Sequence, residues 1–328
     1  MIDSKRRKDF VDWYKWSLTI KDCDPAIHMT NYLFDRFEHN KEQKLWISWI
    51  YGTTYYLPTV WVIWNEFPDM SLVGVERLRD WNNKNYKRLR YQVDTKWNKG
   101  HLPQQFESYK EWVGDKTQSE SFESLLCGNP KENFEMVFEE VKGKFHKFGR
   151  YSTWFYLQTL KQCCGMDIEP NSLMLSDYSG SRSHRNGLLM GLGLDDWYDK
   201  KLDASEYAYL EDVSESILEE VKEEHPTTDY FDMETTLCSF KKLFRIKHGR
   251  YLGYYLDRQA EEIKKCEKDE WNGIDWQPLW DSRNETLEKK LLTNNINAGK
   301  MQLYSESGVL DATGLFRDST IGVESFFQ

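Results

Sequence analysis

Residues 134–145, FEMVFEEVKGKF, decide how the chain folds. Their large apolar side chains follow the spacing i, i+3, i+4, i+7 and i+11, at Phe134, Val137, Phe138, Val141 and Phe145. These positions lie on one face of an α-helix, whereas a strand alternates apolar and polar side chains at every second position. The stretch therefore predicts an amphipathic helix.

The same period recurs along most of the chain. A second helix is expected after Gly149, running to Gly165. Further helical patterns lie in residues 30–50, 58–68, 75–81, 210–221, 232–244, 254–266 and 279–292. Loops are expected at residues 100–103 and 114–121. Because strand-like alternation is nearly absent, we predict an all-α fold of many helices.

A chain of 328 residues can bury a large core in one large domain or two smaller ones. We expect an aromatic and basic extension at 1–29, a helical catalytic domain at 30–293, and a surface tail at 294–328. An alternative is that the catalytic domain consists of two helical lobes, divided near residues 115–130. The tail is expected because residues beyond 294 are poor in large apolar side chains.

The composition excludes several classes of protein. No apolar run is long enough to cross a bilayer and no signal peptide is visible, so we expect a cytoplasmic protein without a membrane partner. Six cysteines form no CxxC pair, so neither a metal site nor a cofactor is expected. A net charge of -10 argues against a protein wrapped in nucleic acid.

Three short segments are nevertheless basic and aromatic: residues 84–91, 142–150 and 241–250. They predict a local DNA-binding face on an acidic protein. The candidate contacts are Lys87, Arg88, Arg90, Lys147, Arg150 and Arg250. The alternative is that these segments are solvated helix faces.

Residues 176–194, SDYSGSRSHRNGLLMGLGL, begin polar and end apolar. So many polar groups would need partners away from water that a core helix is not expected here. We predict a loop leading into a short helix from Leu188, with hydroxyls, N–H groups and cations directed at an anion. A solvated turn with paired arginines is the alternative.

Four further runs accompany this stretch in a fixed order. They are RFEHNKEQKLWISWIYGTTYYLPTVWVIWNEFPD (36–69), GRYSTWFYLQTL (149–160), and, later, RYLGYYLDR (250–258) with WQPLWDSR (276–283). In this order, with DYSGSRSHRNGLLMGLG (177–193), the chain resembles the amino acid:DNA transferases of bacteriophages, also called α-glutamyl/putrescinyl-thymine pyrophosphorylases. The resemblance spans roughly residues 30–290. Other positions in these runs are Arg36, Gln43, Tyr55, Arg258 and Arg283.

The resemblance implies a specific reaction on double-stranded DNA. Such enzymes are expected to act on 5-hydroxymethyluracil that a dedicated kinase has pyrophosphorylated, and to replace the pyrophosphate with an amino acid or polyamine. The resemblance also implies an all-helical, DNA-glycosylase-like architecture. One departure is the lack of a clear helix-hairpin-helix glycine hairpin, for which residues 148–150 and Gly165 are imperfect candidates.

This chemistry assigns roles to the polar stretch. Departing pyrophosphate needs fixed cations and donors, which Arg182 and Arg185 can supply. The other candidate anion ligands are Ser181, Ser183 and Asn186. The incoming amine must lose a proton, for which Asp177 and His184 are the nearest groups and Asp257 is the reserve.

Other mechanisms stay open from the sequence. A thiolate of Cys163 or Cys164 could add to the pyrimidine ring, although apolar surroundings raise a thiol pKa. A glycosylase or lyase would use Asp177 to stabilise an oxocarbenium ion and would consume no amine. A non-catalytic DNA-binding component of a viral modification complex would need no buried polar cluster. Reaching the base in a duplex is expected to require its extrusion.

Overall fold

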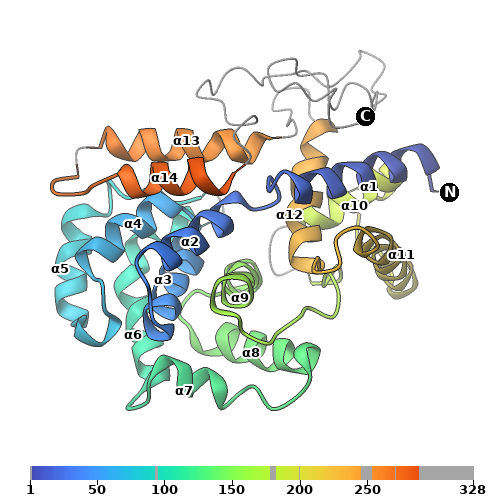
Figure 1. Ribbon diagram of the computed structural model, residues 1–328. Coiled ribbons are helices and arrows are strands. Elements are labelled where there is room, and N and C mark those ends of the chain that lie inside the picture. Colours follow the sequence, from blue (N-terminus) through green and yellow to red (C-terminus); the bar gives the residue numbers. More distant parts are fainter. Residues whose placement is uncertain are drawn as a thin grey trace. The chain divides into compact units, whose positions relative to one another are not determined.

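The computed structural model describes residues 2–92, 95–177, 182–198, 200–244, 253–269 and 271–287 (Figure 1). Within these ranges the chain forms fourteen α-helices, four short 3₁₀ helices and no strand. The all-α fold predicted from the helical period is therefore confirmed. Residues 294–328, expected to form a surface tail, lie outside the described residues.

The described chain divides into two compact units. Unit 1 comprises residues 2–25 and 171–260, and unit 2 comprises residues 26–170 and 261–286. The chain crosses between the two units more than once, and the crossing after Ala260 lies within α13 (Tyr254–Glu267). These units are defined by contacts in space, and the domain bounds expected from the sequence stay predictions.

Unit 2 is built around the buried helix α3 (Lys41–Thr54), which packs against α9 (Arg150–Cys164). A Cβ atom on Gly52 of α3 would lie only 2.7 Å from the Cβ of Tyr156 on α9, so glycine permits this close approach. The other helices of this unit are α2 (Pro25–Arg36), α4 (Leu57–Glu66), α5 (Val75–Asn85), α6 (Leu102–Val113), α7 (Gln118–Glu123), α8 (Pro130–Lys144) and α14 (Gln277–Thr286).

A column of stacked aromatic rings fills the centre of unit 2. The Trp46 and Trp49 rings lie 5.1 Å apart and the Trp49 and Tyr109 rings 5.2 Å apart, each pair at 9° between planes. Trp112 extends the column from Tyr109 at 6.0 Å. Offset stacking adds about 0.5–1.5 kcal/mol per pair to the free energy of area burial. Much of the aromatic content of the chain thus serves the core.

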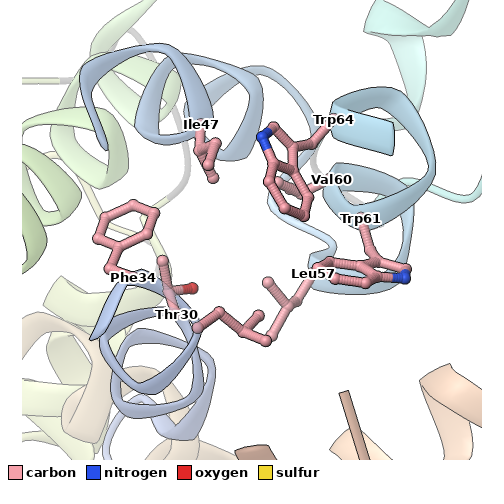
Figure 2. A pocket seen from close by; sticks show the side chains of 8 residues that line it. Thr30, Phe34, Ile47, Leu57, Val60, Trp61 and Trp64 are labelled. Carbon is pink, nitrogen blue, oxygen red and sulfur yellow. The ribbon is translucent and has the colours of Figure 1, made fainter. Parts of the chain in front are cut away.

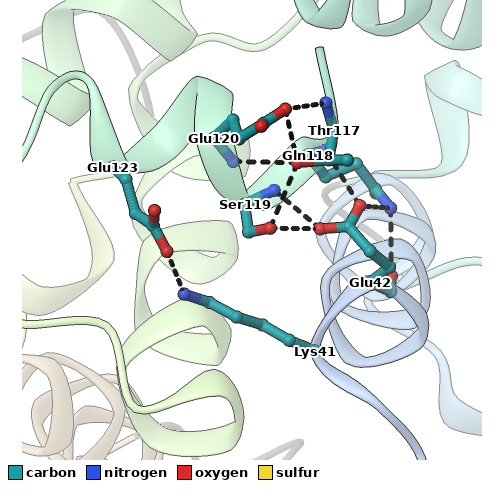
Figure 3. A network of polar contacts seen from close by, with 7 residues as sticks. All are labelled: Lys41, Glu42, Thr117, Gln118, Ser119, Glu120 and Glu123. Carbon is teal, nitrogen blue, oxygen red and sulfur yellow. Dashed lines mark hydrogen bonds and ion pairs between the residues drawn. The ribbon is translucent and has the colours of Figure 1, made fainter.

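Polar contacts hold α7 against the start of α3 (Figure 3). The Glu42 carboxylate accepts the backbone N–H groups of Gln118 and Ser119, each at 2.9 Å, at the N-terminus of α7. Burial opposes the charge of Glu42, but the hydrogen bonds from Ser119 and Gln118 outweigh it and lower the pKa of Glu42. An ion pair at 2.5 Å between Lys41 and Glu123 lies beside it.

Unit 1 is centred on α12 (Tyr230–Phe240), which packs against α1 (Ser4–Thr19) and α10 (Ser183–Leu192). The Trp13 indole N–H of α1 donates to the Ser239 hydroxyl at 3.1 Å, and the Phe10 ring meets Phe240 edge-on at 5.2 Å. The remaining long helix is α11 (Ala204–Lys222). The N-terminal segment thus supplies part of the core of this unit.

Gly187 sets the distance between α10 and α12. A Cβ atom built on Gly187 would lie 2.2 Å from the carbonyl oxygen and 2.7 Å from the carbonyl carbon of Leu237. Both are backbone atoms of α12, so they cannot move aside as a flexible side chain would. The two helices can therefore approach this closely only because residue 187 has no side chain.

Three local expectations were wrong. Residues 100–103 belong to the 3₁₀ helix η2 (Lys96–His101) and to the start of α6 rather than to a loop. Residues 118–121 belong to α7, whose N-terminus is stabilised by Glu42 and by a capping box at Thr117. Helix α10 begins at Ser183, five residues before the expected Leu188.

We predict that Gly187→Ala destabilises unit 1 by about 1–3 kcal/mol or more, because the added methyl group overlaps backbone atoms of α12. Gly143→Ala in α8 is the matched control, since its Cβ meets nothing within 4 Å, and it should be neutral or stabilising by up to about 1 kcal/mol. Urea denaturation followed by circular dichroism measures both. Equal midpoints for the two variants would contradict the packing described for α10.

Candidate active site

The first turn of α10 carries three consecutive buried polar side chains, all of them candidates from the sequence analysis. His184, Arg185 and Asn186 are all buried, with Arg185 only 1% exposed. The expectation that this run could not enter a core helix was therefore wrong. The physical reason is that α11 and α12 supply polar partners, which local sequence does not reveal.

Glu234 of α12 lies beside His184. The His184 Nδ1 atom is 3.4 Å from the Glu234 Oε1 atom, and the two side chains are 2% and 1% exposed. The Cys238 thiol, one turn along α12, donates to the same carboxylate oxygen at 3.5 Å. A buried carboxylate next to an imidazole can fix its orientation and stabilise its positive charge.

Lys241, at the end of α12, reaches the start of α10. Its ammonium group donates to the Ser183 hydroxyl at 2.5 Å, and the lysine is buried. Ser183 is the first residue of α10, and the preceding Arg182 makes no side-chain capping bond. A cation therefore lies at a helix N-terminus, where N–H groups and the helix dipole already favour an anion.

Helix α11 holds both ends of the polar stretch. The Arg185 guanidinium donates to the Tyr207 hydroxyl at 3.0 Å. The Glu211 carboxylate accepts the N–H groups of Leu173 at 3.3 Å and Leu175 at 2.8 Å, just before the stretch begins. Burial raises the pKa of Glu211, partly offset by these bonds.

This cluster, formed by Ser183, His184, Arg185, Glu234 and Lys241, is called the α10–α12 cluster below. Its members come from two separate parts of the sequence, residues 183–185 and 234–241, and four of them are buried side chains that can carry charge: His184, Arg185, Glu234 and Lys241. Buried charges contribute little net stability, because desolvation offsets their attraction. Their concentration at one helix N-terminus is instead typical of a functional site.

The remaining catalytic candidates are distributed as follows. Asp177 is half-buried at the end of the segment held by α11, and Arg182 is exposed at the start of α10. Ser181 lies outside the described residues. Asp257 is buried in the first turn of α13. Burial of Asp22 raises the pKa of that carboxyl group to about 8, and the charge of Asp257 contributes to the rise.

The candidate DNA contacts differ in their surroundings. Lys87 is exposed, whereas Arg90 forms a two-pronged ion pair with Asp269, with N–O distances of 2.6 and 2.8 Å. The Arg88 guanidinium lies 4.1 Å from the centre of the Trp271 ring. Arg150 is buried at the start of α9. Lys147 is exposed, and Arg250 lies outside the described residues.

Of the other positions from the resembling runs, all but Arg258 lie in unit 2. Arg36 pairs with Asp281 at 2.6 Å, and Gln43 completes a capping box at the start of α3. Tyr55 ends α3 in a left-handed conformation and packs on Phe155 at 4.2 Å. Arg283 is buried in α14. Arg258 is half-buried in α13 of unit 1.

Burial makes Cys164 and Cys238 poor nucleophiles in this structure. Burial raises the pKa of Cys164 to about 12, and burial also raises the pKa of Cys238 well above its usual value. Thiolate, rather than thiol, is the reactive form. The open possibility of a covalent route through Cys164 is therefore disfavoured.

Other features of the described chain do not resemble a catalytic site. A pocket in unit 2 is lined almost wholly by apolar side chains of α2, α3 and α4, with Phe34 facing Trp64 across it (Figure 2). Among the described residues no three His, Cys, Asp or Glu side chains gather as metal ligands. None of the described helices is long and apolar enough to span a membrane.

Comparison with known proteins decides the family. Residues 21–249 match the amino acid:DNA transferase family, a span that contains α10, α11 and α12. This chain belongs to the amino acid:DNA transferase family. It is also 30% identical over 294 residues to a serinyltransferase of Salmonella phage ViI, covering 82% of this chain and 71% of the relative. No solved structure matches it.

The family membership makes the chain a DNA-modifying transferase that uses DNA and an amino acid. Glu234, Lys241 and Tyr207 are the residues that sequence analysis missed. A signal for two of them exists: Glu234, Leu237, Cys238 and Lys241 are spaced i, i+3, i+4 and i+7. A carboxylate and an ammonium group on an otherwise apolar helical face require buried partners.

Proposed function

We propose that this transferase replaces the pyrophosphate of 5-(pyrophosphoryloxymethyl)uracil in DNA with the amino group of an amino acid. The observation that carries the proposal is the α10–α12 cluster, which places Lys241 and Ser183 at a helix N-terminus next to exposed Arg182. Serine is the first candidate donor, by analogy with the phage serinyltransferase. A base kinase acting earlier would supply the pyrophosphorylated DNA.

The reaction needs an anion site. The bond between the methylene carbon and oxygen breaks, and pyrophosphate leaves with the electron pair while the amine nitrogen bonds to the carbon. The leaving group gains negative charge, and we assign its stabilisation to Arg182, Lys241 and the N–H groups of α10, which lie together at the start of that helix. Arg185 is buried against Tyr207, so we assign it to holding α10 in place rather than to direct contact.

The reaction also needs a base, because the attacking nitrogen must lose a proton. Asp177 is half-buried and precedes α10, whereas His184 is almost fully buried. We therefore assign proton removal to Asp177, whose carboxylate an amino acid can approach. We assign His184 and Glu234 the role of a positioning pair that fixes the start of α10.

The direct test is incubation of the full chain with DNA carrying the pyrophosphorylated base, in the presence of serine, other amino acids or putrescine. The DNA is then digested and its nucleosides are analysed by mass spectrometry. We expect a new nucleoside that contains the amino acid, together with released pyrophosphate. An abasic site would indicate a glycosylase instead, and unchanged DNA in every mixture would contradict the proposed reaction.

We predict that Arg182→Lys lowers turnover more than DNA affinity, because lysine keeps the charge and loses the planar fork. Loss of one such donor typically costs about 2.7–4 kcal/mol of barrier stabilisation.

Asp177→Asn should suppress transfer most at low pH, where the donor amine is mostly protonated, and should leave DNA affinity nearly intact. Near-normal turnover in a folded double variant would remove this loop from the active site.

A further inference from the structure

An exposed tryptophan on unit 2, Trp97, has a lysine over its ring. Trp97 belongs to η2 and is 74% exposed, and the Lys96 ammonium group lies 4.8 Å from the centre of its ring. A single exposed apolar side chain is ordinary on a protein surface. What distinguishes Trp97 is the combination of a hydrogen-bonded backbone segment and the Lys96 cation at its ring.

The backbone around Trp97 is fixed by buried polar contacts. The Thr95 hydroxyl donates to the carbonyl of Thr54 at 2.8 Å, and Asn82 donates to the carbonyl of Lys99 at 3.2 Å. Thr95 and Asn98, on either side of the Trp97 segment, are themselves buried. Hydrogen bonds on both sides of Trp97 therefore hold the backbone that carries the exposed indole, which lowers the backbone entropy lost on binding.

Helix η2 also joins two of the basic segments singled out in the sequence. In the second half of η2, burial and then the positive charge of Arg90 lower the pKa of Lys99. Two residues further on, the Lys147 ammonium group lies 3.0 Å from the His101 Nε2 atom. Unit 2 thus brings residues from both 84–91 and 142–150 to the C-terminal half of η2.

The C-terminal end of η2, at His101, has an exposed cation beside it, Lys147. Burial lowers the pKa of His101, and the charges that lower it further are those of Lys147 and His146. The His101 and His146 rings lie 5.7 Å apart. Lys147 is exposed and its ammonium group contacts the His101 ring, so a DNA phosphate can pair with the Lys147 charge. The chain as a whole carries a net charge of -10, so this positive charge is local.

We propose that Trp97 stacks on an unstacked base of the DNA substrate, while Lys96, Lys99 and Lys147 contact neighbouring phosphates. Extruding a nucleotide exposes the faces of adjacent bases, and an aromatic side chain can cover such a face. A flat ring flanked by cations fits a nucleic acid with an unpaired position better than it fits an uninterrupted duplex. The inference rests on DNA being the substrate and not on the pyrophosphate chemistry.

The test measures the affinity of the full chain for two labelled duplexes by fluorescence anisotropy, one fully paired and one with a single unpaired base. Trp97→Ala should weaken binding to the second duplex by about 5- to 150-fold and change binding to the first much less. Trp97→Phe should recover most of the loss. Leu72→Ala is the matched control, since Leu72 is 76% exposed on the same unit.

The cations are tested through the salt dependence of binding. Lys96→Gln and Lys147→Gln should each reduce the slope of log affinity against log salt by about 1, whereas Lys116→Gln, an exposed control, should not. Unchanged DNA affinity in Trp97→Ala would overturn the proposal and indicate a different partner for this surface. Equal weakening on both duplexes would overturn stacking. Because neither duplex carries pyrophosphate, these outcomes are independent of the transfer assay.

Discussion

The structure of unit 1 depends on the close packing of α10 against α12. Gly187 allows backbone contact between them, and that contact brings His184 within 3.4 Å of Glu234. An imidazole and a carboxylate buried this deeply would each be costly without the other. The same packing places Lys241 on the first residue of α10. One steric constraint thus positions several of the charged groups of the candidate site.

This arrangement links stability to function. Apolar residues at the same positions would satisfy the core with less desolvation, so the α10–α12 cluster is better explained by chemistry than by stability. The N-terminus of α10, Lys241 and Arg182 form a positively polarised region. Glu211 of α11 binds the backbone at Leu175, two residues before Asp177 in the sequence. A reaction that expels a polyanion and deprotonates an amine needs both a cationic region and a base.

The sequence predicted the fold class because apolar side chains at helical spacing report directly on burial. Helix α8 and the end of α9 at Gly165 follow that pattern closely. Helix α10 was placed too late, because its first turn is polar and its burial depends on Tyr207 and Glu234, far away in the chain. Local sequence cannot show such partners.

The polar stretch itself was recognised, but its partners were not. The spacing of Glu234, Cys238 and Lys241 marks one face of α12, yet nothing local indicates that this face meets α10. Likewise, η2 was expected to contain a loop, because Gly100 and Pro103 dominate its local pattern. Its order comes from hydrogen bonds to the end of α3 and to α5, which only the folded chain supplies.

The most direct measurement is a double-mutant cycle between His184→Gln and Glu234→Gln, read out as the single-turnover rate of amino acid transfer to DNA. Circular dichroism would establish that each variant is folded at the assay temperature. If the two residues position the active site as a pair, the double variant should lose little more activity than the worse single variant, with a coupling of about 0.5–3 kcal/mol. Folded variants that transfer the amino acid at the rate of the unaltered chain would contradict the assignment of the α10–α12 cluster as the active site.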